Sequence, residues 1–394
     1  MRILVLGGDG YLGWPTALHL SAAGHDVGVA DNFARRGYDA ELGATSLIPI
    51  APLRRRVAAW REVTGRRIEV FEGDLTDPSF ATTMVRAFAP KAIVHFAEQR
   101  SAPYSMIDQA HAVYTQTNNV IGTLNLLYAI AETDPDVHLV KLGSMGEYGT
   151  PNIDIEEGWL EVSHKGRTDR VLYPKRPGSF YHLSKVHDSH NIEFACRAWG
   201  LRATDLNQGI VYGQETEETG RHRALATRFD YDAVFGTVLN RLVVEAVCGH
   251  PLTVYGTGRQ VRGMLDIRDT VECIRLAVEH PADRGEFRVF NQFTEEVSVI
   301  GLAEMIKALY HRPVEIAMVD NPRVEAAEHY YHAAHSALLD LGLEPHLLSD
   351  TLLESLFAIT ERHRANVDTS LFEPTVRWTP EPDRVGPRVP AALG

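Results

Sequence analysis

Cysteines are scarce in this chain, and long apolar runs are lacking. The three cysteines, Cys196, Cys248 and Cys273, are odd in number and widely spaced, which argues against a disulfide scaffold or a metal site. We expect buried, reduced thiols in a reducing compartment. No apolar run has membrane-spanning length, and a strand-like run begins at residue 2, which leaves no room for a signal or transit peptide. A cytoplasmic protein with no membrane partner is therefore predicted.

Positive charge is also in short supply. The chain has 39 Lys and Arg against 52 Asp and Glu, a formal net charge of −13. Nucleic acids and acidic membranes need a basic surface for nonspecific binding, so neither partner is expected. Anionic ligands must be met by local arginines and helix ends. With 394 residues, 44% of them hydrophobic, the chain can form two modest domains or one large domain with a satellite lobe.

Three glycines follow the first strand-like run, Ile3–Leu6. They are Gly7, Gly10 and Gly13, at three-residue spacing. In a dinucleotide site the first permits a tight turn, the second lets the backbone approach a pyrophosphate, and the third lets the next helix pack on the strand. We expect that helix over residues 11–23, with its free N–H groups directed at the phosphates.

Asp31 ends the next apolar run, about 20 residues on, as the dinucleotide pattern requires. A carboxylate there accepts hydrogen bonds from the adenosine ribose and repels a 2′-phosphate. The sequence therefore predicts NAD rather than NADP, a preference that the nearby Arg35 and Arg36 weaken.

Strand-like runs alternate with helix-like stretches through the first half of the chain. They cover residues 3–6, 27–30, 68–71, 93–96 and 139–142. This pattern predicts an α/β fold with a doubly wound parallel sheet, a Rossmann domain, over residues 1–207. Residues 34–66 are interpreted as a surface insertion with a helix near 53–64 and a solvated basic run at 54–56.

The alternation fades after residue 207. Residues 208–394 are expected to form mainly a smaller α/β substrate lobe, with some return to the sheet domain. From about residue 370 the chain is rich in proline and short of periodicity. That stretch is interpreted as a tail that is draped on the surface or partly disordered.

Tyr181 and Lys185 carry the strongest catalytic signal. Their spacing of four residues places both on one face of a helix. An ammonium favours the phenolate, so Lys185 is expected to lower the pKa of Tyr181 toward that of a general base. Ser144 ends a strand-like run, where ligands of parallel sheets bind, and can hydrogen-bond the same substrate hydroxyl.

Together these residues resemble the extended short-chain dehydrogenase/reductase superfamily and, within it, the UDP-sulfoquinovose synthase family. The segments that resemble this family are Gly8–Trp14, His95–Met106, Lys141–Gly149, Ser179–Asn191, Arg202–Gly209 and Asn321–Tyr331. The resemblance implies an NAD site formed by Gly7, Gly10, Tyr11, Leu12, Gly13, Asp31, Asn32, Arg35, Asp74, Leu75, Ala97, Gln99, Asn119, Tyr181, Lys185 and Gln208.

The resemblance also implies a reaction. UDP-glucose is oxidised at carbon 4, water is lost across carbons 5 and 6, sulfite adds at carbon 6 to form a carbon–sulfur bond, and the hydride returns. Tyr181 would be the base for the carbon-4 hydroxyl, and Lys185 its electrostatic partner and nicotinamide-ribose ligand. Ser144 would be the third member, where the family usually has threonine; without the β-methyl, its rotamer is less restricted.

Elimination needs a further acid and base. The related 4,6-dehydratases have an Asp-Glu pair just after the catalytic threonine, where this chain has Met145 and Gly146. Glu147 and His182 are the candidates for this work. Glu147 could instead cap a backbone N–H, and His182 could have a packing role. Met145 could form an apolar wall beside carbon 6.

Local cations must bind sulfite and the UDP diphosphate. Arg100 is the candidate near the sugar, Arg262 and Arg323 resemble the superfamily's diphosphate-binding arginines, and Asn207 is a candidate substrate contact. A homodimer or higher homo-oligomer is expected from the superfamily, and no metal. The alternatives are an NAD-dependent nucleotide-hexose 4-epimerase or 4,6-dehydratase without sulfite, and a catalytically silent nucleotide-sugar or NAD-binding protein.

Overall fold

A seven-stranded parallel sheet forms the centre of the structure, a computed structural model that describes residues 1–326, 329–348 and 352–379. The strand order is β12-β8-β5-β4-β1-β2-β3. The strands are β1 (Arg2–Leu6), β2 (Asp26–Asp31), β3 (Ile68–Glu72), β4 (Ala92–His95), β5 (His138–Ser144), β8 (Arg202–Gln208) and β12 (Phe287–Gln292). The predicted Rossmann fold is confirmed. The order reverses between β1 and β4, which opens a ligand crevice at their carboxyl ends.

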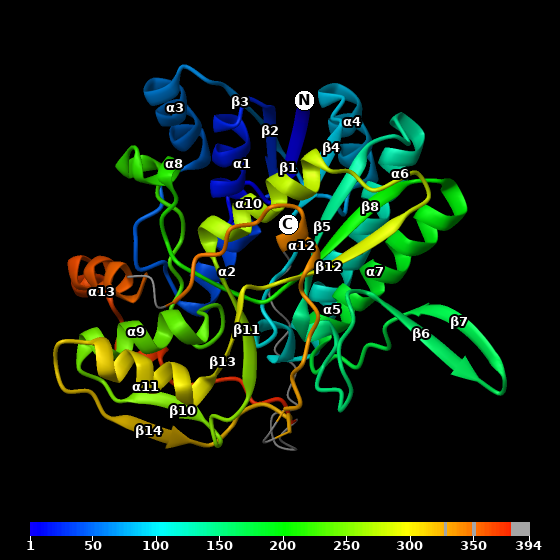
Figure 1. The fold of residues 1–394 in the computed structure, drawn as a ribbon. Coiled ribbons are helices and arrows are strands. Elements are labelled where there is room, and N and C mark those ends of the chain that lie inside the picture. The colour runs from blue at the N-terminus through cyan, green and yellow to red at the C-terminus, as the bar shows by residue number, and fades with distance from the viewer. Residues whose placement is uncertain (327–328, 349–351, 380–394) are drawn as a thin grey trace.

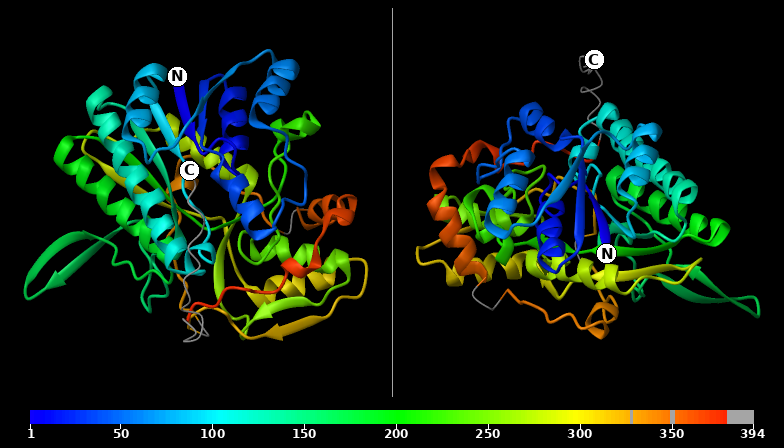
Figure 2. Two further views of the ribbon diagram at one scale, coloured as in Figure 1. Left: turned by 180° about the vertical axis from the view of Figure 1, so that it is seen from behind. Right: turned by 90° about the horizontal axis from the view of Figure 1, so that it is seen from above.

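Helices cover both faces of this sheet (Figures 1 and 2). One face carries α1 (Gly13–Ala22), α3 (Leu53–Thr64) and α10 (Ile267–Glu279), and the other α4 (Pro78–Phe88), α6 (Gly122–Thr133) and α7 (Phe180–Trp199). Alternate residues of β1 enter the two cores: Ile3 and Val5 one, Leu4 and Leu6 the other. The continuous apolar runs follow from this burial on both faces.

The insertion after β2 contains α2 (Ala34–Leu42) and α3, whose bounds match the expected helix. Its basic run is not solvated throughout, which corrects the sequence interpretation. Arg54 and Arg55 face solvent, but Arg56 is fully buried, 3.1 Å from a carboxylate oxygen of Asp9 and stacked over Trp14. Burial lowers the pKa of Arg56 to about 9. Arg56 therefore stabilises the glycine loop through its ion pair with Asp9.

A second lobe lies at the carboxyl edge of the sheet (Figure 1). It has a parallel pair, β10 (Leu252–Tyr255) and β14 (Ile316–Val319), and a three-stranded sheet of β9 (Ile210–Tyr212), β11 (Val261–Asp266) and β13 (Glu295–Ser298). Its helices are α9 (Val238–Cys248), α11 (Val299–Leu309) and α13 (Leu352–Arg362). The proposed boundaries, 1–207 and 208–394, stay a prediction, and residues 380–394 of the expected tail lie outside the described residues.

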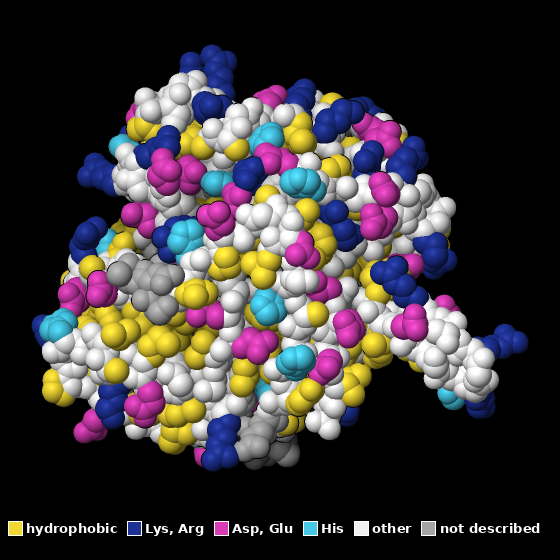
Figure 3. All heavy atoms as spheres, viewed as in Figure 1, with side chains coloured by type: hydrophobic (Ala, Val, Ile, Leu, Met, Phe, Trp, Pro, Cys, Tyr) yellow, Lys and Arg dark blue, Asp and Glu magenta, His cyan; other side chains and the backbone are white. Residues whose placement is uncertain are grey.

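The hairpin of β6 (Trp159–His164) and β7 (Arg167–Leu172) projects from the body (Figure 2). The remaining helices are α5 (Gln109–Gln116), α8 (Glu217–Gly220) and α12 (Ala337–Asp340), and a π-helical segment, Thr117–Ile121, joins α5 to α6. Figure 3 shows cationic and anionic side chains interspersed on one face rather than gathered by sign.

All three thiols are free, with Cys196 and Cys273 buried and Cys248 partly exposed, so the expectation of burial holds for two of them. Among the helices in the described part of the chain, none is long and apolar enough to cross a lipid bilayer.

Candidate active site

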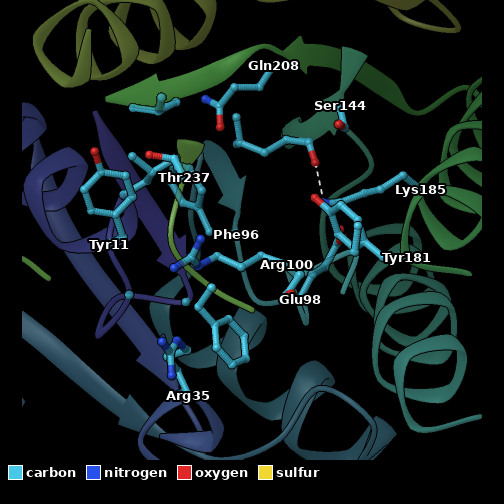
Figure 4. A pocket seen from close by; sticks show the side chains of 18 of the residues that line it. Tyr11, Arg35, Phe96, Glu98, Arg100, Ser144, Tyr181, Lys185, Gln208 and Thr237 are labelled. Atoms are coloured by element: carbon cyan, nitrogen blue, oxygen red, sulfur yellow. Dashed lines mark hydrogen bonds and ion pairs between the residues drawn. The ribbon is translucent and has the colours of Figure 1, made fainter. Parts of the chain in front are cut away.

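A long pocket runs along the carboxyl ends of β1, β2, β4 and β5 and extends to the second lobe. Figure 4 shows Tyr11 at one end and Ser144, Tyr181 and Lys185 at the other. The expected residues that line it are Gly7, Gly10, Tyr11, Leu12, Gly13, Asp31, Asn32, Arg35, Asp74, Leu75, Ala97, Arg100, Ser144, Tyr181, His182, Lys185, Gln208, Arg262 and Arg323. The pocket thus brings together the glycine motif and the Tyr-Lys pair.

The glycine loop is shaped for close backbone approach. Gly7 has φ +83°, and a Cβ on Gly13 would lie 2.1 Å from the carbonyl oxygen of Gly7. No side chain caps the N-terminus of α1, and the dipole of the helix favours an anionic ligand at this end. A cradle that any Cβ would fill, beside an uncapped helix end, fits the pyrophosphate of NAD.

Asp31 lines the pocket at the carboxyl end of β2. Its carboxylate accepts hydrogen bonds from the backbone N–H groups of Asp9 and Phe33, at 2.8 and 2.7 Å. Burial raises the pKa of Asp31 to about 6 despite those bonds. Arg36 donates a hydrogen bond to Asp9, and Arg35 forms ion pairs with the carboxylates of Asp39 and Asp230. Both guanidiniums are engaged, which weakens the case for a 2′-phosphate.

Strand β5 and helix α7 position the catalytic candidates. Ser144 is the last residue of β5, and Ser179 caps α7, so that Tyr181 lies in its first turn. Lys185 lies one turn on, with Nζ 5.7 Å from the Tyr181 ring centroid, and donates to the carbonyl oxygen of Leu142 at 2.6 Å. Ser144, Tyr181 and Lys185 thus line the same pocket.

The expectation of a net lowered pKa for Tyr181 is wrong for the protein alone. Burial raises the pKa of Tyr181, Lys185 lowers it in part, and the carboxylate of Glu98 raises it again. The sequence pattern predicted the contribution of Lys185, but it predicted neither the burial of Tyr181 nor that Glu98, which lies in another motif, would be close enough to oppose the lysine.

The imidazole of His182 fills the space that a side chain at position 146 would need. A Cβ on Gly146 would lie 2.2 Å from Nε2 of His182, so only glycine leaves room for the imidazole. The Nδ1 atom lies 2.9 Å from Oγ of Ser179. Burial, with Arg323 nearby, lowers the pKa of His182 to about 4, so the ring is neutral at pH 7. A neutral imidazole at the pocket wall can take up a proton.

Glu147 does not line the pocket, which corrects its candidacy as acid or base. Its buried carboxylate accepts from the backbone N–H of Ser144 at 2.9 Å in a capping box, and pairs with Lys175 and Lys141. Burial alone would raise the pKa of Glu147, but the two lysines outweigh it and hold the pKa at about 2. The structure therefore agrees with the alternative in which Glu147 caps a backbone N–H.

Four other candidates lie behind the pocket wall rather than on it. Gln99 and Asn119 hydrogen-bond each other through backbone and side chain, and Asn207 donates to the hydroxyl of Tyr148 at 2.7 Å. Met145 packs in a buried cluster with the same tyrosine. Direct ligand contacts are therefore not assigned to these four. The motifs that contain these residues did not reveal which of their side chains face the pocket.

The three candidate arginines lie in two different parts of the pocket. Arg100 pairs with Asp230 at 2.5 Å, and in Figure 4 its side chain points toward Tyr11 rather than Ser144. Its contact with the sugar stays a prediction. Arg262 and Arg323 lie on the second-lobe wall, where Arg262 pairs with Glu325 at 2.6 Å. These two stay candidates for the diphosphate.

Sequence reasoning missed part of the lining. Tyr38, Glu98, Phe235, Arg241 and Tyr255 all line the pocket. Glu98 lay within a quoted motif, so its charge was a usable signal. The aromatic residues of the second lobe come from segments with no local signature.

The chain is similar in sequence to known proteins. The NAD dependent epimerase/dehydratase family matches residues 3–291. A chloroplastic UDP-sulfoquinovose synthase of Spinacia oleracea is 58% identical over 96% of this chain and 79% of its own length. The UDP-sulfoquinovose synthase of Sulfolobus acidocaldarius is 47% identical over 88% of each chain.

Solved structures share the fold. A UDP-glucose 4-epimerase from Bifidobacterium longum in complex with NAD+ and UDP has a TM-score of 0.69 at 19% identity, covering 93% of this chain and 100% of its own. The UDP-glucose-4-epimerase of Stenotrophomonas maltophila, with NAD bound, has a TM-score of 0.72 at 18% identity and the same coverage.

Proposed function

The chain belongs to the NAD dependent epimerase/dehydratase family and, within it, to the UDP-sulfoquinovose synthases, and from this premise we propose that it converts UDP-glucose and sulfite to UDP-sulfoquinovose. The observation that carries the proposal is the pairing of Gly146 with His182 beside Ser144 and Tyr181. It supplies a proton acceptor where a 4,6-dehydratase has its Asp-Glu pair.

The glycine loop, Asp31 and Lys185 would hold NAD, which when bound accepts a hydride from carbon 4 of the sugar and later returns it. Tyr181 removes the proton of the carbon-4 hydroxyl, and Ser144 orients that hydroxyl through Oγ. Lys185 stabilises the phenolate form of Tyr181 that accepts this proton. The resulting 4-keto group acidifies the proton on carbon 5.

His182 takes the carbon-5 proton and passes it to the departing carbon-6 hydroxyl, which leaves as water. Its neutral ring suits the first step, and the imidazolium that forms suits the second. Sulfite, entering as hydrogen sulfite, would then add to carbon 6 of the enone, and its proton would reach carbon 5 through His182. Tyr181 would return its proton to the carbon-4 oxygen as that carbon is reduced again. Arg262 and Arg323 would bind the diphosphate, as an acidic protein must use local cations.

We also propose that the protein forms a homodimer. Apolar side chains stay exposed on the helices beside the site: Val113 of α5, Tyr128 of α6 and Phe194 of α7. Contact between two copies of this helical face would cover them. The cytoplasmic location stays a prediction; the Spinacia relative is named as chloroplastic.

The test is mass spectrometry of the products formed from UDP-glucose by the purified protein, with and without sulfite. A sulfonated UDP-hexose that forms only with sulfite supports the proposal. An isomer or a dehydrated sugar formed without sulfite would instead identify an epimerase or a 4,6-dehydratase.

A further inference from the structure

Residues 372–379, which we call the C-terminal segment, run from the core of the second lobe to the pocket wall. At its start Phe372 is fully buried in the second-lobe core. The ring of Phe372 lies 6.0 Å from the ring of Tyr231 and 5.2 Å from that of His250. Figure 2 draws the segment in red along the second lobe. Apolar packing thus anchors the segment at one end.

Beyond Phe372 the exposure of the side chains alternates. Pro374, Val376 and Trp378 are partly buried, whereas the residues between them, 373, 375 and 377, are exposed. A period of two is that of an extended chain with one face against a surface. The inward face of this extended stretch ends at its largest side chain, Trp378.

Trp378 contacts both lobes beside the site. Its backbone N–H donates to the carbonyl oxygen of Pro322 at 3.0 Å, and the guanidinium of Arg323 lies over its ring, 5.5 Å from the ring centroid. A Cβ added to Gly178 would lie 3.7 Å from Cζ3 of Trp378. Gly178 directly precedes Ser179, which caps α7. The indole ring therefore contacts an arginine of the second lobe and the turn that starts the catalytic helix.

Arg323 differs from its neighbours on the pocket wall. Arg241 and Arg262 also line the pocket there, and each forms an ion pair with a glutamate. Among the residues that the structure describes, the guanidinium of Arg323 has no hydrogen bond or ion pair. Its charge is therefore available to an anionic ligand, and the ring of Trp378 supports it instead of a carboxylate.

An aromatic ring is a suitable support for such a group. A carboxylate would restrain Arg323 too, but it would neutralise the charge and occupy N–H donors that a diphosphate needs. The ring attracts the cation through its quadrupole, and it accepts no conventional hydrogen bond. All five N–H donors of the guanidinium thus stay available while its position is restrained.

We propose that Trp378 is a positioning residue that holds Arg323 at the pocket wall for the diphosphate of the substrate, so that the C-terminal segment completes the substrate half of the site. This role rests on the proposed function, because that function supplies the diphosphate. The glycine loop and Asp31 belong to the unit of β1, α1 and β2, so NAD binding should not depend on Trp378.

The experiment is calorimetric titration of UDP into the NAD-loaded protein. Trp378→Leu keeps an apolar side chain beside Gly178 and removes the aromatic face, so UDP should bind roughly three- to tenfold more weakly. Trp378→Phe keeps an aromatic face and should retain most of the affinity. The NAD content of both variants should equal that of the unmodified protein.

Arg377→Ala is the matched control. It removes a positive charge from the same segment, but its side chain is exposed, so the affinity for UDP should stay unchanged. The double variant, Trp378→Leu with Arg323→Ala, tests whether the ring acts through the arginine. It should bind UDP no more weakly than Arg323→Ala alone.

Unchanged affinity in Trp378→Leu, an equal loss in Trp378→Phe or in Arg377→Ala, or fully additive losses in the double variant would overturn the role of Trp378. If Arg323→Ala weakens UDP binding and Trp378→Leu does not, the role of Trp378 fails while the proposed function stands. If the unmodified protein does not bind UDP, the proposed function fails, and the role of Trp378 fails with it.

Discussion

At the scale of single residues, the site depends on how much space each position leaves. The imidazole of His182 lies where a side chain on Gly146 would stand, so the identity of one residue requires the other. Sequence patterns identified both positions, because they fall in motifs. They misjudged Glu147, since its direction depends on the turn after β5 and on Lys175, which is distant in sequence.

Gly146→Ala should impair elimination. Its Cβ would lie 2.2 Å from Nε2 of His182 and displace the imidazole. We expect the rate of sulfonated product to fall on the order of a hundredfold, because small misplacements of a catalytic group are costly. Stopped-flow measurement of cofactor reduction should show that oxidation at carbon 4 persists.

Gly178→Ala is the matched control, since a Cβ there meets its nearest atom only at 3.7 Å. Equal loss in both variants, or full activity in Gly146→Ala, would contradict the role of His182.

Tyr181→Phe should keep NAD and lose turnover. It removes the general base and leaves the glycine loop intact, so a loss of roughly 10²- to 10⁴-fold is expected. The measurement is turnover alongside the cofactor content of the purified variant. Tyr128→Phe, on the exposed face of α6, should behave like the unmodified protein. Near-normal turnover in Tyr181→Phe would refute the assignment.

At the scale of elements, the unit of β1, α1 and β2 forms the cofactor site. Its strands were predictable because burial on both faces produces unbroken apolar runs. The insertion helix α3 was predictable too, but not the burial of Arg56, because that depends on packing against Asp9 and Trp14 of another element. Local periodicity predicts that a helix forms, but the element against which the helix packs decides which of its side chains are buried.

Gly13→Ala should weaken cofactor binding. The added Cβ would lie 2.1 Å from the carbonyl oxygen of Gly7, so β1 and α1 must separate, at a cost of about 1–3 kcal/mol. We expect lower NAD content and a lower melting temperature. Gly37→Ala tests the alternative of a general effect, since its Cβ meets nothing within 4 Å in α2. Unchanged NAD binding in Gly13→Ala would count against the cradle.

At the scale of the whole molecule, the pocket joins two lobes that the sequence could describe only separately. Phe235, Arg241 and Tyr255 reach it from the second lobe, through contacts between residues far apart in the chain. Such contacts leave no local pattern. Arg262 and Arg323 were found because they lie in recognisable segments.

Arg323→Ala should separate the two ligands. Arg323 lies on the second-lobe wall, away from the glycine loop, so UDP should bind roughly ten- to a hundredfold more weakly while NAD is retained. Calorimetry with UDP and the cofactor content of the variant provide the two readouts. Arg284, a surface arginine, serves as the control position. Loss of both ligands would indicate a structural role instead.

The most direct test of the whole account follows one deuterium atom. UDP-glucose deuterated at carbon 4 is converted in the presence of sulfite, and the product is analysed by NMR and mass spectrometry. The account predicts a sugar sulfonated at carbon 6 with its deuterium back on carbon 4. Deuterium on carbon 6 of a 6-deoxy-4-keto sugar, or on carbon 4 of an unsulfonated epimer, would contradict it.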